Sequence, residues 1–126
     1  MREVKFDPRG GTLAVEIVVK GGQPGAYRVF LWNAKRTKQL GVAAGLTTDP
    51  TPSRVAVPVA AALAAGRLLE WNVVVEGQIG DAYHLSVVLL QGDKPLRGGR
   101  LRYQGELETT QLALVGLVTF VAKAAP

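Results

Sequence analysis

Apolar and polar residues alternate along most of this chain. From Thr12 to Lys20 every second residue is aliphatic, beginning with Leu13 and ending with Val19. Successive side chains of a strand point to opposite faces, so this period of two predicts a half-buried β-strand. The same alternation returns in four further segments, residues 54–60, 67–76, 82–91 and 99–109.

Three other segments predict strands from weaker or two-sided patterns. Residues 40–46 alternate only weakly, whereas residues 26–34 and 111–123 are apolar on both faces. A strand that is apolar on both faces is typical of a central position or of a face covered by a partner. Residues 60–65 have helix propensity, and Gly66 limits them to one short helical turn.

These elements indicate an all-β protein. A chain of 126 residues fits one domain, so we interpret residues 1–126 as a single antiparallel β-sandwich of seven to eight strands. The strand spacing is compatible with an immunoglobulin-like or C2-like outline, although the chain has no cysteine and hence no Cys-Trp-Cys pattern. An outline of this kind is a likeness of fold and carries no function.

A short sequence pattern occurs twice along the chain. Residues 18–29 and 74–85 both contain aliphatic residues, one charge, Gly, Gln-x-Gly and then Ala-Tyr. We interpret each copy as a β-hairpin with a glycine-rich turn, which puts Tyr27 and Tyr83 at equivalent places where the returning strands begin. Two origins fit the pattern: a duplication into related halves, 12–60 and 67–121, or convergence on common turn residues.

The chain is basic, with 15 Lys and Arg against 10 Asp and Glu and a net charge of +5. Such a balance attracts nucleic acid, an anionic membrane surface or an acidic partner, or it only keeps the surface solvated. The candidate contacts with an anionic partner are Lys35, Arg36, Lys38, Arg100 and Arg102. A nucleic-acid-binding β-domain that uses them as one basic strip is the alternative function.

Few residues in the chain suit catalysis or metal binding. The single histidine, His84, has Ser86 two residues along its strand, about 6.6 Å away, which is too far for a nucleophile–base contact. One histidine and no cysteine exclude the usual zinc ligands, and the loop aspartates lack the spacing of a calcium loop. We therefore predict no catalytic residue, no metal and no cofactor. An enzyme with His84 as acid or base is the third class of function.

Apolar residues exceed what one inner layer of a sandwich needs. The two-sided strands carry Phe30, Trp32, Val115, Leu117 and Val121, which we predict to form an exposed association surface. The sequence therefore favours a non-catalytic binding or assembly module, either a homo-oligomer or a subunit of a larger complex.

The terminal and apolar segments bear on location. Residues 1–8 lack the apolar core of a signal peptide. The longest apolar run, residues 112–122, is far shorter than the roughly 20 residues of a membrane helix. We expect a soluble chain without a signal peptide or a transmembrane segment, and its compartment stays open.

Overall fold

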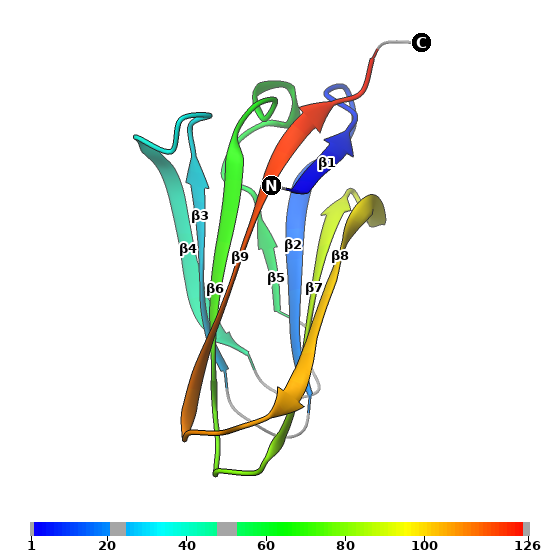
Figure 1. The fold of residues 1–126 in the computed structure, drawn as a ribbon. Helices are drawn as coiled ribbons and strands as arrows, with labels where there is room; N and C mark the ends of the chain where they lie inside the picture. Colours follow the sequence, from blue (N-terminus) through cyan, green and yellow to red (C-terminus); the bar gives the residue numbers. More distant parts are fainter. Residues whose placement is uncertain (1, 21–24, 48–52, 125–126) are drawn as a thin grey trace.

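The computed structural model describes residues 2–20, 25–47 and 53–124, which form two packed β-sheets (Figure 1). The strands of the first sheet are β1 (Arg2–Phe6), β3 (Gly25–Trp32), β4 (Gln39–Thr47), β6 (Leu68–Glu76) and β9 (Gln111–Ala122). Those of the second are β2 (Leu13–Lys20), β5 (Ser53–Ala56), β7 (Ala82–Gln91) and β8 (Lys94–Glu106). The strand orders are β1-β9-β6-β3-β4 and β5-β2-β7-β8. The predicted all-β sandwich is confirmed.

The described residues contain one strand more than the sequence predicted. β1 pairs in parallel with β9, with Val4 opposite Phe120, whereas the other described pairs are antiparallel. Only Val4 and Phe6 mark β1 in the sequence, and two apolar positions are too few to establish a period of two. The predicted helical turn is present as a 3-10 turn at Ala61–Leu63. Among the described residues, no helix is long and apolar enough to cross a membrane.

The hairpins predicted over residues 18–29 and 74–85 are wrong. β2 and β3 lie in different sheets, and so do β6 and β7, so each copy of the repeated pattern leads the chain from one sheet to the other (Figure 1). The glycine turn predicted in the first copy falls largely on residues 21–24, which lie outside the described residues. A strand–turn–strand pattern has the same appearance in a hairpin and in a corner between two sheets, which explains the error.

The two halves of the chain repeat one pairing scheme. β2 pairs with β5 and β7, and its counterpart β6 pairs with β9 and β3. The hairpin of β3 with β4 is matched by that of β7 with β8. The strands β2 to β5 therefore have counterparts, β6 to β9, with matching neighbours in the opposite sheet, except that β9 also pairs with β1.

An aliphatic core fills the space between the sheets. Its largest side chain is Trp71 on β6, which is fully buried. Gly116 faces Trp71 on β9, and a Cβ at Gly116 would overlap the indole ring. The sandwich therefore needs glycine at this position, because any side chain would displace the ring from a close-packed interior.

Candidate association surface

The five residues predicted to form an association surface share the outer face of the five-stranded sheet. Their alternate neighbours, such as Leu31 and Val118, are buried in the core, which turns the predicted residues outward. The register brings them close together, since both Phe30 and Leu117 pair with Glu70 of β6. The five predicted residues are Phe30 and Trp32 on β3 and Val115, Leu117 and Val121 on β9.

Further apolar side chains extend this outer face over four strands. Leu46 on β4 is 77% exposed and Val115 on β9 is 53% exposed. Small residues between these two leave a hollow of about 410 Å³, which is lined on the outer face by residues of β3, β4 and β6. The additional apolar residues of the outer face are Ala26, Ala44, Leu68, Val74 and Ala113. The face therefore has both a projecting aliphatic side chain and a depression.

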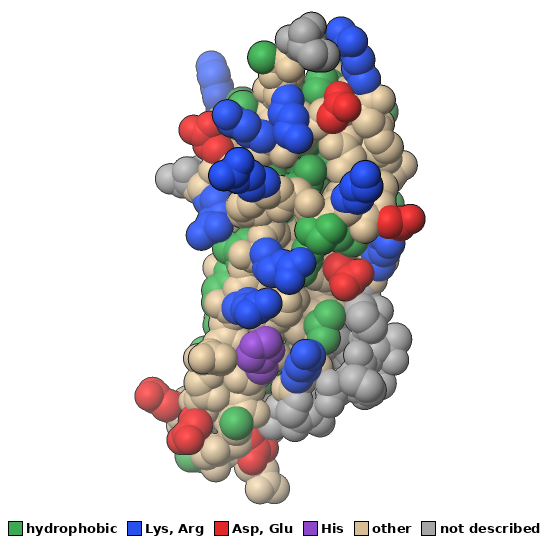
Figure 2. Space-filling view, turned by 90° about the vertical axis from the view of Figure 1, so that its right-hand side faces the viewer, with side chains coloured by type: hydrophobic (Ala, Val, Ile, Leu, Met, Phe, Trp, Pro, Cys, Tyr) green, Lys and Arg blue, Asp and Glu red, His purple; other side chains and the backbone are tan. Residues whose placement is uncertain are grey.

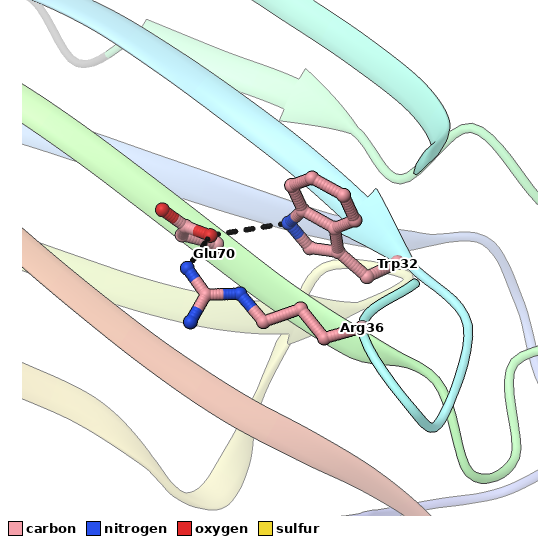
Figure 3. Close-up of polar contacts among 3 residues, drawn as sticks. All are labelled: Trp32, Arg36 and Glu70. Carbon is pink, nitrogen blue, oxygen red and sulfur yellow. Dashed lines mark hydrogen bonds and ion pairs between the residues drawn. The ribbon is translucent and has the colours of Figure 1, made fainter. Parts of the chain in front are cut away.

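Trp32, Arg36 and Glu70 form a polar cluster at one end of this face (Figure 3). The indole Nε1 of Trp32 donates a hydrogen bond to Glu70 Oε1 at 3.1 Å, and Arg36 Nη2 donates to the same oxygen at 2.6 Å. The guanidinium carbon of Arg36 lies 5.8 Å from the centre of the Trp32 ring. The carboxylate of Glu70 is mostly buried, so Arg36 supplies the countercharge that an acidic group on an apolar face requires.

Asn33 builds the turn that places Arg36. Its Oδ1 accepts hydrogen bonds from the backbone N–H groups of Thr37 at 2.8 Å and Lys38 at 3.0 Å, and its Nδ2 donates to Thr37 Oγ1 at 2.8 Å. Arg36 has φ of 56°, the left-handed conformation that side chains other than glycine rarely adopt. The side chain of Asn33 therefore determines where the guanidinium of Arg36 lies.

The structure does not join the five predicted anion contacts into one strip. Lys35, Arg36 and Lys38 belong to the turn between β3 and β4 of the five-stranded sheet. Arg100 and Arg102 lie on β8, which packs beside β1, whereas β4 packs beside β5 at the other lateral edge. The two groups therefore lie on different sheets and at opposite edges. The role of Glu70 was not predicted, because a pairing between residues 34 positions apart leaves no local pattern.

His84 lies on the outer face of the four-stranded sheet. Its cross-strand neighbours are Lys20 on β2 and Gln104 on β8, and neither carries a carboxylate that could orient an imidazole base. The Nδ1 atom is buried and has no hydrogen-bond partner within the described part of the chain. The same part of the chain contains no group of three or more His, Cys, Asp or Glu residues that could hold a metal ion.

Comparison with known proteins adds information on the fold. No family model and no curated protein matches the chain. A DUF4425 family protein from Bacteroides ovatus is similar in structure, with a TM-score of 0.53 and 14% identity over 86% of this chain and 94% of that one. A DUF4425 domain of unknown function from Bacteroides vulgatus has a TM-score of 0.53 and 15% identity over 90% of this chain and 97% of that one. At these identities the likeness concerns the fold alone.

Proposed function

We propose that this protein is a non-catalytic assembly module that pairs with a second copy through the outer face of its five-stranded sheet. The observation that carries the proposal is the group of apolar side chains on the outer face of β3, β4, β6 and β9, which lies on both sides of a middle row that contains Arg28 and Asn72, with Val115 half exposed. Burial of apolar surface contributes about 25 cal/mol per Å², and large exposed patches of this kind mark interaction sites.

The size of the face is sufficient for a specific pair. Strands lie about 4.8 Å apart and rise about 3.3 Å per residue, so the four strands of this face, with some eight residues each, span roughly 20 by 25 Å. When two such faces pack together, they bury on the order of 1,000 Å² even if each is treated as flat. This area is about the minimum for a specific protein–protein interface.

The shape of the face suits a second copy. Twisted sheets pack face to face at about −30°, so a sheet with the same twist is the best-fitting partner for this one. A twofold axis that runs along the strands between β3 and β6 would bring β9 of the partner over β4. The projecting Val115 of each copy would then face Ala44 at the hollow of the other, because Val115 and Ala44 lie in the same cross-strand row.

The charges of the face permit its burial. Glu70 already has Arg36 as a partner within one copy, so association does not leave that carboxylate unpaired. Arg28 is the other charged residue near the middle of the face, and it is exposed. Its long side chain allows the guanidinium to reach the rim, and arginine is among the residues enriched in protein interfaces.

Sedimentation velocity over a range of protein concentrations tests this proposal. We expect a concentration-dependent dimer for the natural chain and a monomer for Val115→Asp, because the variant places a charge where Val115 would contact Ala44 of the other copy. The matched control is Val18→Asp, which changes a half-buried valine on the outer face of the other sheet. A natural chain that stays monomeric at millimolar concentration, or equal effects of both variants, would overturn the proposal.

A further inference from the structure

Basic side chains gather on the outer face of the four-stranded sheet and at its β1 edge. Figure 2 shows Lys and Arg side chains along this face, with the single histidine among them. Glu16 and, at the far end of β8, Glu106 are carboxylates on the face, and Asp93 at its other end is paired with Arg54 at 3.1 Å. The basic residues are Lys20 on β2, Arg54 on β5, Arg97, Arg100 and Arg102 on β8, and Lys5 and Lys123 at the β1 edge.

Arg100 and Arg102 form the centre of this basic face. Both are exposed, and neither forms an ion pair or a side-chain hydrogen bond within the described ranges. Two positions along one strand separate them, so their side chains leave the same face about 6.8 Å apart. Ser86 pairs with Arg102, and His84 pairs with Gln104, which adds polar groups beside the guanidinium groups.

A hollow continues the basic face beyond Arg100. It has a volume of about 390 Å³ and lies where β1 packs beside β8. Three cations and one carboxylate line it: Lys5, Arg97, Lys123 and Glu3. Arg2 Nη1 donates a hydrogen bond to the carbonyl oxygen of Gly98 at 3.1 Å, which ties β1 to β8 beside this hollow. The net positive charge of the lining suits an anionic group.

The residue types on this face indicate which class of anionic polymer it suits. Proteins that hold single-stranded nucleic acid stack bases on exposed aromatic rings. Within the described strands, the tyrosines of this sheet, Tyr83 and Tyr103, point inward beside the core, and no Phe, Trp or Tyr occupies its outer face. The face therefore offers charges and polar groups in an extended row without a platform for bases.

We propose that this face binds a linear anionic polysaccharide that carries sulfate or carboxylate groups. The chain would follow β8 past Arg102 and Arg100 and would place one anionic group in the hollow beside Lys5 and Arg97. Arg100 and Arg102 lie on the sheet opposite to the proposed dimer face, whereas Lys5 lies at the β1 edge of the dimer sheet, across from Val121. Variants of Arg100 and Arg102 therefore test polysaccharide binding separately from self-association, and either proposal can fail alone.

Affinity measurements with heparin, a polyuronate, a single-stranded oligonucleotide and a DNA duplex of similar charge test the inference. We expect the polysaccharides to bind more tightly than either nucleic acid, with affinity that falls steeply as salt rises. Arg100→Gln with Arg102→Gln should weaken polysaccharide binding by roughly tenfold, on the scale of two exposed charge contacts.

The matched control removes two charges from the other sheet. Lys35→Gln with Lys38→Gln has the same net charge as the arginine pair and should bind as the natural chain does. Circular dichroism establishes that both variants fold. Equal losses in the two variants, tighter binding of either nucleic acid, or no retention of polysaccharide at low salt would each overturn the inference.

Discussion

Tyr27 and Tyr83 occupy matching positions in the two sheets, and each lies across a glycine of the adjoining strand. Tyr27 pairs with Gly45 on β4, and Tyr83 pairs with Gly105 on β8. A Cβ at Gly45 would lie 2.6 Å from the hydroxyl of Tyr27, and one at Gly105 would lie 2.9 Å from that of Tyr83. The repeated Ala-Tyr of the sequence therefore marks an equivalent contact in both sheets, in which the tyrosine ring packs over the backbone of a cross-strand glycine.

Glycines beneath aromatic rings should differ in their tolerance of a methyl group. Gly116→Ala should lower the free energy of unfolding by about 2–3 kcal/mol, because the fully buried ring of Trp71 has no space into which it can move. Gly105→Ala should cost less, about 1 kcal/mol, because Tyr83 is only half buried and its hydroxyl end can shift toward solvent. Urea unfolding measures both values, and equal costs would contradict this account.

In the polar cluster on the association surface, loss of the acceptor Glu70 should destabilise the fold more than loss of the donor Arg36. Glu70→Ala leaves both Trp32 Nε1 and Arg36 without their shared partner, so we expect a loss of about 1–2 kcal/mol in unfolding free energy. Arg36→Gln should cost less than about 1 kcal/mol, because Arg36 is half exposed and water solvates its pair. Unfolding followed by tryptophan fluorescence tests this order, and a larger loss in the arginine variant would contradict it.

The sequence predicted the layers of this fold better than its connections. The period of two at residues 12–20 was sufficient to place Leu13 and Val19 in the core, because burial follows directly from alternation. Pairing depends on distant strands, so nothing near residues 18–29 distinguished a hairpin from a change of sheet. The same reason explains why Arg36 was predicted as a contact with an anionic partner and its pairing with Glu70 was not: Glu70 lies on β6 and becomes a neighbour only when β3 and β6 pair.

The turn between β3 and β4 should depend on the side-chain oxygen of Asn33. Asn33→Ala removes the acceptor for two backbone N–H groups and should cost about 1–2 kcal/mol of unfolding free energy. Asn33→Asp is the matched control, since it keeps the acceptor and loses only the bond from Nδ2 to Thr37. In thermal unfolding, the Asn33→Asp variant should therefore be more stable than the Asn33→Ala variant. Both variants lack the Nδ2 bond and only aspartate keeps the acceptor, so the reverse rank would contradict a role of the Oδ1 acceptor in the turn.

The two tryptophans of the chain allow an optical test of the surface that the dimer uses. Trp32 lies partly exposed on the proposed contact face, whereas Trp71 is fully buried in the core. Dimer formation should therefore shift the emission of Trp32 to shorter wavelength as protein concentration rises, because water leaves the face. Trp32→Phe keeps an aromatic side chain there and retains only Trp71, whose emission should not change with concentration. If sedimentation shows a dimer and the emission of the natural chain stays constant, association occurs through a surface other than the outer face of the five-stranded sheet.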